Sequence, residues 1–324
     1  MDKLSYTVLE SFGIQQVKKK VKGSYICQTN AGLSKVHITT EPTDAICFQH
    51  FIKKHLTERG FPWTDRYLLT KSGQPYLVVG REVYVMTIHH EAQRDVDFMC
   101  ENDVLEAIKT LARFHIAASG INTSMHEKNS PMQPSLSQTY ERKKTELWQA
   151  LKQARRSPRL SDFDVLFIKH AQHYSDIIQD SIRHLKKTNY TELLADSLKN
   201  SMLCHNALKE ENLPYTNQGV YIINFANAKI GLQLCDLASF IQRYALRGNK
   251  KVPLTSLLEA YDRIHPLPSG AKEIVYALLL FPNAFMKIIT QYYSKKRNWT
   301  PNGLLKRMEM VLAERESYEK YIGV

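Results

Sequence analysis

Residues 17–90 carry short runs rich in β-branched and aromatic side chains, bounded by turn residues. Five such runs predict strands at 22–29, 33–39, 67–70, 74–79 and 82–88. The first two flank Asn30-Ala31-Gly32 and predict a hairpin. Residues 45–59 instead repeat apolar positions at helical spacing and stop at Gly60. This part of the chain is expected to form a small antiparallel sheet with one helix.

From residue 101 onward the apolar positions repeat with a helical period. Helices are predicted at 102–118, 139–154, 163–185, 235–246, 254–264, 272–280, 284–295 and 302–321. One short β-rich run, 221–223, interrupts them and predicts a strand beside the helices. The pattern therefore predicts an α+β chain with a β-rich lobe at 1–88 and a mainly helical lobe at 89–324.

The composition is that of a packed globular protein, with 324 residues of which 43% are hydrophobic. The longest apolar run, Ile274 to Phe281, is far shorter than the roughly 20 residues that span a bilayer. A soluble protein without a membrane partner is expected. The five cysteines are an odd number without a C-x-x-C pair, so neither a disulfide framework nor a zinc site is indicated, and a reducing compartment is favoured.

Lysine and arginine exceed aspartate and glutamate by 44 − 32 = 12, which favours attraction to polyanions. The surplus is spread over short clusters, often with acidic residues nearby, and no RNP-like motif or zinc finger accompanies them. Solvated helix or turn faces are therefore favoured over a nucleic-acid groove. The clusters are Lys18–Lys20, Arg142–Lys144, Arg155–Arg156, Lys186–Lys187, Lys250–Lys251 and Lys295–Arg297.

The segment 203–238 contains candidate chemistry. It reads His205-Asn206-Ala207 with Asn212 five residues later, then Ile223-Asn224-Phe225-Ala226, Gly231 and Asp236-Leu237-Ala238. The spacing resembles the active-site strip of aminoglycoside and choline phosphotransferases, H-G-D-x-x-x-x-N followed by I-D-F-D, a glycine and D-L-A. The resemblance implies a two-lobe, protein-kinase-like fold with this strip at the cleft.

The likeness extends outward over about residues 10–320. Leu111–His115 with Ser119-Gly120 resembles the L-A-x-x-H helix that opens the large lobe of these enzymes. Further motifs resemble the bacterial spore-coat kinase-like family, the CotS family, and its YutH-like branch: Tyr261-Asp262, Pro266-Leu267, Leu280-Phe281-Pro282, Tyr292-Tyr293 and Trp299-Thr300-Pro301. By this resemblance we expect a sporulation protein made in the mother-cell cytoplasm and then placed in the spore coat, with other coat proteins as partners.

The strip departs from the resembled pattern at its acidic positions. By that resemblance, one aspartate orients the substrate hydroxyl and a second holds the metal that bridges the phosphates. Ala207 and Asn224 stand at these positions, and Ala226 stands at the third acidic position. Alanine neither accepts a proton nor binds metal, and asparagine offers only a neutral carbonyl. No catalytic residue is intact, and Asn212 alone matches a metal-ligand position, so no metal is expected.

The small lobe is expected to lack phosphate contacts as well. If 33–38 is the third strand, His37 takes the place of the phosphate-pairing lysine, with Lys35 on the same face, and Lys54 takes the place of its acidic partner. No Gly-rich cradle is evident, so neither ATP nor magnesium is expected as a cofactor. In the resembled strip His205 braces the loop, and Asp236 is interpreted as architectural at the start of a helix, where it can act as a cap.

The sequence therefore predicts a catalytically inactive pseudokinase of the endospore coat that acts in coat assembly through protein contacts. One alternative is an active phosphotransferase with an altered ATP and metal site that recruits Glu210, Glu211 or Asp236. A second alternative is a polyanion-binding module that uses the +12 charge. Magnesium-dependent stabilisation by a nucleotide would favour the first alternative over the prediction.

Overall fold

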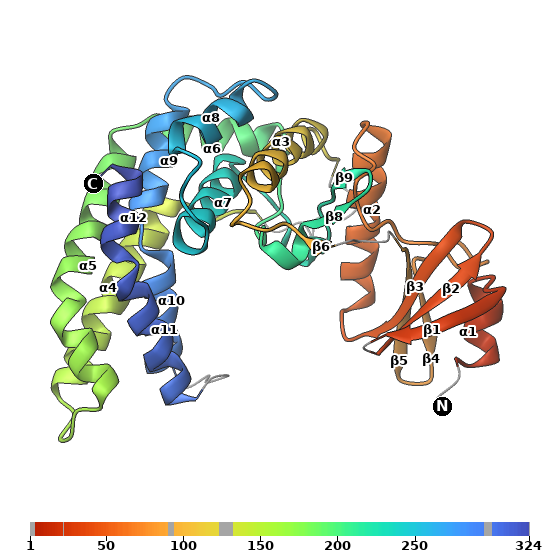
Figure 1. Cartoon of the computed structure of the whole chain (residues 1–324), viewed down its shortest axis with the longest axis horizontal. Helices are drawn as coiled ribbons and strands as arrows, with labels where there is room; N and C mark the ends of the chain where they lie inside the picture. The colour runs from red at the N-terminus through yellow and green to blue at the C-terminus, as the bar shows by residue number, and fades with distance from the viewer. Residues whose placement is uncertain (1–3, 22, 90–93, 123–131, 295–299, 324) are drawn as a thin grey trace. The chain divides into compact units, whose positions relative to one another are not determined.

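The computed structural model describes residues 4–21, 23–89, 94–122, 132–294 and 300–323. The chain divides into two compact units, each drawn in Figure 1. The sheet unit comprises 1–97, 102–132 and 197–231, and the helical unit comprises 98–101, 133–196 and 232–324. Most of the predicted active-site strip thus belongs to the same unit as the sheet. The predicted division into lobes at residue 88 stays a prediction.

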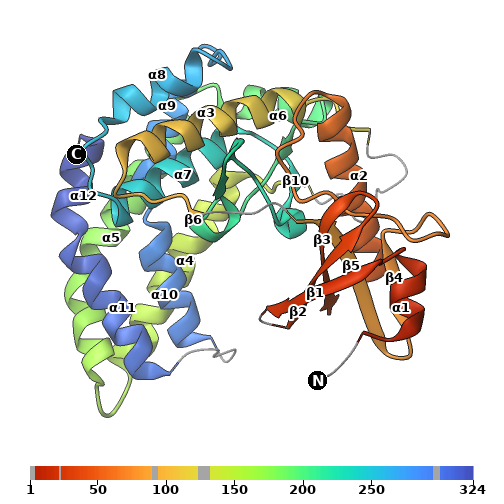
Figure 2. The same cartoon turned by 45° about the vertical axis from the view of Figure 1, so that its right-hand side comes forward.

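Five antiparallel strands of the sheet unit pair in the order β1-β2-β3-β5-β4 (Figure 2). Their bounds are β1 Gln16–Val21, β2 Ser24–Thr29, β3 Gly32–Thr39, β4 Tyr76–Val79 and β5 Glu82–Ile88. The tight turn between β2 and β3 passes through Gly32 at φ 97°, a conformation that glycine adopts without steric cost. The predicted hairpin is therefore present.

The predicted number of strands in this sheet is correct, but one strand is a different segment. Residues 67–70 contribute only a bridge from Tyr67 to Thr87, and β1 takes the fifth place. All six residues of β1 are exposed. An edge strand with no buried face has no alternating apolar pattern, so the hydrophobic pattern could not reveal it.

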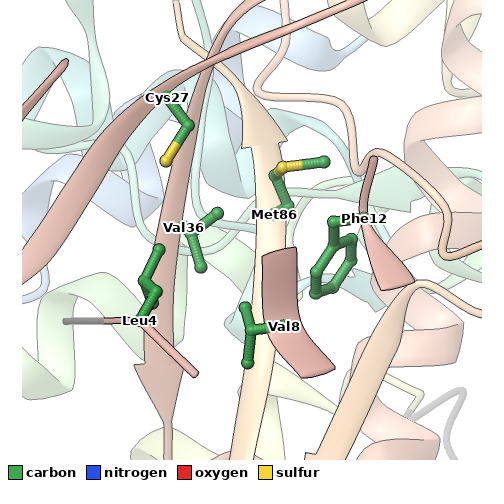
Figure 3. Close-up of a cluster of buried hydrophobic side chains, with 6 residues drawn as sticks. All are labelled: Leu4, Val8, Phe12, Cys27, Val36 and Met86. Atoms are coloured by element: carbon green, nitrogen blue, oxygen red, sulfur yellow. The ribbon is translucent and has the colours of Figure 1, made fainter. Parts of the chain in front are cut away.

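One face of the sheet is covered by a short helix, α1 (Tyr6–Ser11), which the hydrophobic pattern did not predict. Ser5 begins it as an N-cap whose hydroxyl accepts the Val8 N–H. The buried side chains between α1 and the strands form the core drawn in Figure 3: Leu4, Val8, Phe12, Cys27, Val36 and Met86. Burying such side chains contributes about 1.5–3 kcal/mol each, so this core determines that the Val36 face of β3 is turned toward α1. His37, the next residue, lies on the opposite face of the strand.

A longer helix, α2 (Thr43–Glu58), follows β3, as predicted. The sheet unit also contains α3 (Glu101–Ala117) apart from its first residue. Short strands lie around the strip: β6 Arg94–Asp95, β7 Leu203–Cys204, β8 Pro214–Thr216, β9 Gly219–Val220 and β10 Lys229–Ile230. The predicted strand at 221–223 is wrong. Tyr221 and Ile222 are buried. Their N–H groups donate to the carbonyl oxygens of Pro214, the first residue of β8, and of Trp63, but neither residue belongs to a strand.

The helical unit is built from α4 to α12. Their bounds are α4 Leu136–Arg155, α5 Asp162–Lys186, α6 Tyr190–Lys199, α7 Leu234–Arg247, α8 Leu254–Asp262, α9 Ala271–Leu280, α10 Asn283–Tyr293, α11 Pro301–Ala313 and α12 Arg315–Ile322. The prediction missed α6, whose last residues belong to the sheet unit, and merged α11 with α12, which separate at Glu314. Trp299, part of one resembling motif, lies outside the described residues.

The segment Ala271–Tyr293 is long and apolar enough to cross a membrane by length and composition. In the structure it is two helices, α9 and α10, interrupted at Phe281-Pro282. Inside the helical unit, 61% of the most apolar 18-residue stretch of this segment is buried. Its apolar residues therefore serve as core of this unit, which is the ordinary reason for such a run in a globular fold.

Candidate active site

His205 lies at the centre of the strip, directly after β7, and is fully buried. Its Nδ1 accepts the N–H of Ala207 at 3.3 Å, and its Nε2 lies 2.9 Å from the carbonyl oxygen of Ile223. Because Nδ1 is an acceptor, the proton is on Nε2, which donates to that carbonyl. Both ring nitrogens are engaged by the backbone, so the imidazole joins the two halves of the strip and has no nitrogen left to act as a base.

The loop after His205 keeps an unusual backbone conformation. Asn206 has φ 58°, where the resembled strip carries glycine. Asparagine tolerates this left-handed region better than most side chains. The turn is therefore built without glycine, and it places the methyl group of Ala207 where the resembled strip has its first carboxylate.

Two asparagines of the strip, Asn212 and Asn224, are hydrogen-bonded to each other. Asn224 has φ 66° and ψ 75°, and its Nδ2 donates to Oδ1 of Asn212 at 3.3 Å. The Nδ2 of the buried Asn212 donates to the carbonyl oxygen of Ala207 at 2.8 Å. The Asn212 oxygen that corresponds to a metal ligand is therefore occupied by an amide.

The oxygen donors of the strip do not fit a divalent cation. Magnesium is held in phosphoryl-transfer sites by one or two carboxylates together with the phosphates, whereas Asn212 and Asn224 are neutral. Ala226 is exposed in a single 3₁₀ turn and offers no side-chain oxygen. Among the residues that the structure describes, no group of three or more metal-binding side chains lies together.

Carboxylates that could replace the missing aspartates lie on β6 and on the turn that follows Ala207. Glu210 and Glu211 belong to the 3₁₀ turn Glu210–Asn212, and Glu211 pairs with Lys209. Burial raises the pKa of Asp95, and the charges of Glu211 and Glu210 raise it further. None of these carboxylates occupies the position of Ala207, where the resembled pattern has its first aspartate.

His37 and Lys35 share one face of β3, as predicted from the alternation of a strand. The pKa of His37 is lowered, mainly by burial and then by the charge of Lys35, with Lys53 adding to the effect and Asp65 opposing it. Because the ordinary histidine pKa is about 6.5, His37 is neutral at pH 7. It cannot supply the positive charge that a phosphate-pairing lysine supplies.

Lys54 does not face the sheet. Its side chain is 64% exposed and pairs with Glu58 at 3.8 Å. The inward position of α2 belongs to its neighbour Lys53, which sequence reasoning missed: its side chain is 2% exposed, its Nζ lies 3.0 Å from Oδ1 of Asp65, and it lies 4.0 Å from the ring centroid of Tyr67. The helical phase of the buried residues of α2 was the available signal.

The charge order in this lobe is thus reversed. The helix carries the buried cation and the segment after it carries the acid, whereas the resembled enzymes place the cation on the strand and the acid on the helix. In the described residues no lysine of β3 other than Lys35 is present, and Lys35 is exposed.

Asp236 belongs to the helical unit, in the first turn of α7, and is 1% exposed. It is not the cap residue, since α7 begins at Leu234 after Gln233. An acidic side chain in the first turn interacts favourably with the positive end of the helix dipole. The architectural interpretation of Asp236 stays a prediction.

A spore-coat family, described as "Spore coat putative kinase YutH", matches residues 6–324. The chain belongs to this YutH family of the spore coat. The match spans both units and confirms the family that the C-terminal motifs indicated.

Solved structures agree on the fold. An aminoglycoside phosphotransferase from Alicyclobacillus acidocaldarius is similar over 100% of this chain and 96% of its own, with 20% identity and a TM-score of 0.83. A spectinomycin phosphotransferase bound to AMP is similar over 98% of this chain and 92% of its own, with 12% identity and a TM-score of 0.63. An amicoumacin kinase bound to AMP-PNP and Ca²⁺ is similar over 97% of this chain and 92% of its own, with 10% identity and a TM-score of 0.58. The predicted α+β, aminoglycoside-phosphotransferase-like fold is confirmed.

Proposed function

We propose that this YutH-family member is a catalytically inactive, kinase-like protein of the spore coat that acts in coat assembly through contacts with other coat proteins. The hydrogen bond from Asn224 to Asn212 carries the proposal. It joins the two side chains at the metal-ligand positions to each other, and neither of them is charged.

The losses in the strip act on separate steps of phosphoryl transfer. A positioned general base contributes about 10²–10⁴-fold to rate, and Ala207 has no group that accepts a proton. A bound metal supplies several kcal/mol of charge stabilisation, for which Asn224 offers no anionic ligand. Together these substitutions leave the strip without a means to activate a hydroxyl or to neutralise the transferred phosphoryl group.

The sheet unit supports the same proposal. A neutral His37 provides no cation for the nucleotide phosphates. The buried ammonium of Lys53 pairs with Asp65 and lies over the ring of Tyr67, and its side chain is only 2% exposed, so little of it is accessible to a ligand. ATP and magnesium are therefore not proposed as cofactors.

A thermal-shift titration with ATP, with and without MgCl₂, tests the inactive site. A ligand at 100 times its Kd stabilises a folded protein by about 2.7 kcal/mol, so binding would be easily detected. We expect no magnesium-dependent shift for this chain, while the amicoumacin kinase, whose structure holds AMP-PNP and Ca²⁺, serves as the positive control. A clear magnesium-dependent shift would overturn the proposal.

The coat role is tested separately by locating a labelled copy during sporulation. We expect label first in the mother-cell cytoplasm and then in the coat fraction of mature spores, with its coat level falling in strains that lack its partner proteins. A copy confined to the spore core would contradict the assignment.

A further inference from the structure

β1 is an open edge of the five-stranded sheet. In the order β1-β2-β3-β5-β4 it pairs with β2 on one side, and no strand within the described residues pairs with its other side. An edge strand presents a row of N–H and C=O groups that a further strand can pair with. All six residues of β1 are exposed, so neither of its faces is covered by a helix of the described chain.

Two lysines of β1 lack the ion pairs that lysines in some of the other basic clusters form. Lys18 and Lys19 form no ion pair within the described residues. By contrast, Lys143 pairs with Glu146 and Lys186 pairs with Glu141. The charges of Lys18 and Lys19 are therefore uncompensated within the described residues, and a negative group that approaches these two side chains would not have to displace a partner there.

The positive charge continues across one face of the sheet. Lys19 lies opposite Ile26 on β2, and Ile26 lies opposite Lys35 on β3, so the two lysines belong to one cross-strand row. Directly opposed residues of antiparallel strands point to the same face. Lys20, on the other face, lies over the ring of Tyr25, with its Nζ 5.3 Å from the ring centroid.

The edge has apolar contact area as well as charge. Val17 is 40% exposed and Val21 is 41% exposed at the two ends of the lysine run. A strand that adds to a sheet edge obtains affinity from main-chain hydrogen bonds and specificity from alternate side chains. Val17 and Val21 provide places for apolar side chains of such a strand, and the lysines provide places for acidic ones.

A second copy of this chain is a poor occupant. If β1 paired with another β1, the Lys18–Lys20 runs would oppose each other, and like charges directly across a strand pair are destabilising. The same charges favour an acidic strand, because specificity arises from repelling wrong partners as well as attracting the right one.

We propose that β1 is the docking edge for an extended, acidic segment of a partner protein, which adds to the sheet as a further strand beside Gln16–Val21. That the partner is a coat protein rests on the proposed function. The binding itself does not, because β1 lies in a different part of the sheet unit from the strip.

The experiment uses the whole purified chain and a fluorescein-labelled peptide of about eight residues, a usual strand length, that alternates glutamate with threonine. Binding is followed by fluorescence anisotropy, and amide hydrogen exchange locates it. We expect slower exchange in β1 when the peptide is bound. A peptide of the same composition, N-methylated at every second residue, cannot form the ladder and should bind at least about tenfold more weakly.

The variant Lys18→Glu/Lys19→Glu reverses the charge of the edge. Its matched control is Lys287→Glu/Lys306→Glu, which changes the net charge equally at exposed positions of α10 and α11. Each exposed ion pair contributes only modestly, but reversal removes two attractions and adds repulsion. We expect at least about a tenfold loss of peptide affinity in the β1 variant and little change in the control.

Four outcomes would overturn the inference. They are no peptide binding at low salt, equal binding of the N-methylated peptide, equal losses in the two variants, and binding of a single-stranded oligonucleotide with the same β1 protection. Aggregation of the β1 variant without peptide binding by the native chain would make the lysines a guard against self-association instead. ATP turnover by a chain that binds the peptide would overturn the proposed function alone.

Discussion

Replacing Lys53 by methionine should destabilise the protein far more than the same change at its neighbour Lys54. Lys53 has a side chain only 2% exposed, and its ammonium lies 3.0 Å from Asp65 and 4.0 Å from the Tyr67 ring centroid. Lys54 is 64% exposed and lies 3.8 Å from an equally exposed Glu58. The two substitutions are chemically identical and adjacent in sequence, so they differ only in which side of α2 they change.

The size of the difference follows from burial. Removing one partner of a buried ion pair costs about 3–5 kcal/mol, because the other charge is left without compensation. Asp65 is 28% exposed and can regain part of its hydration, while loss of the cation–π contact adds about 1 kcal/mol. Methionine retains much of the packing of the lysine stem. We expect about 2–4 kcal/mol for Lys53→Met and less than about 0.5 kcal/mol for Lys54→Met.

Urea denaturation at pH 7, followed by circular dichroism and by tryptophan fluorescence, measures both variants. Asp65→Asn alone and with Lys53→Met completes a double-mutant cycle, in which a coupling energy well above zero identifies the pair. Equal destabilisation by the two lysine substitutions would refute the helical phase described for α2. A coupling energy near zero would refute the ion pair.

Three further predictions address the strip and the small lobe. Replacing His205 by alanine should cost about 2–4 kcal/mol of unfolding free energy in urea, because it leaves the Ile223 carbonyl without its donor and opens a cavity beside Phe225; a loss below about 1 kcal/mol would contradict the brace. The pKa of His37 is lowered in the folded chain, so as the pH falls the unfolded chain binds this proton first. The free energy of unfolding should therefore drop once the pH goes below about 6.5. His37→Asn should flatten the profile of urea midpoints from pH 7.5 to 5, and an unchanged slope would contradict this. The double change Ala207→Asp/Asn224→Asp should create Mg²⁺ binding by calorimetry but no ATP turnover, because His37 still provides no cation; turnover by this variant would show that the strip was the main defect.

The sequence predicted those helices and strands in which buried apolar residues recur at a regular spacing. Helix α5, bounded as Asp162–Lys186, has a repeating apolar face and a Ser161 capping box, and it was predicted at 163–185. β1 was missed because an exposed edge strand has no such face. The 221–223 run was misassigned because a short buried apolar run does not have to form a strand. The N–H groups of Tyr221 and Ile222 each donate to a single carbonyl, that of Pro214 and that of Trp63.

The candidate site was predictable as far as residue identity decides it. The absence of carboxylates at Ala207 and Asn224 can be read directly from the sequence. The hydrogen bond between Asn224 and Asn212 could not be foreseen, because it depends on the left-handed backbone at Asn224. The choice between Lys53 and Lys54 needed the rotation of α2 to within one residue, or about 100°. The spacing of Ile52 and Leu56 places Lys53 on the buried face, so this signal was present in the sequence but was not used.

In active members of the resembled superfamily the strip both keeps a particular backbone path and carries catalytic carboxylates. In this chain the backbone path is kept without the carboxylates. The path of the strip depends on left-handed backbone at Asn206 and Asn224 and on the two backbone hydrogen bonds of His205. None of these needs a carboxylate. Aspartate, like asparagine, is enriched in left-handed conformations, so Asn224→Asp can be accommodated without moving the chain. The residues that fix the path of the strip therefore do not require the carboxylates of the resembled pattern, which is why the spacing of the strip predicts the fold while its side chains argue against the reaction.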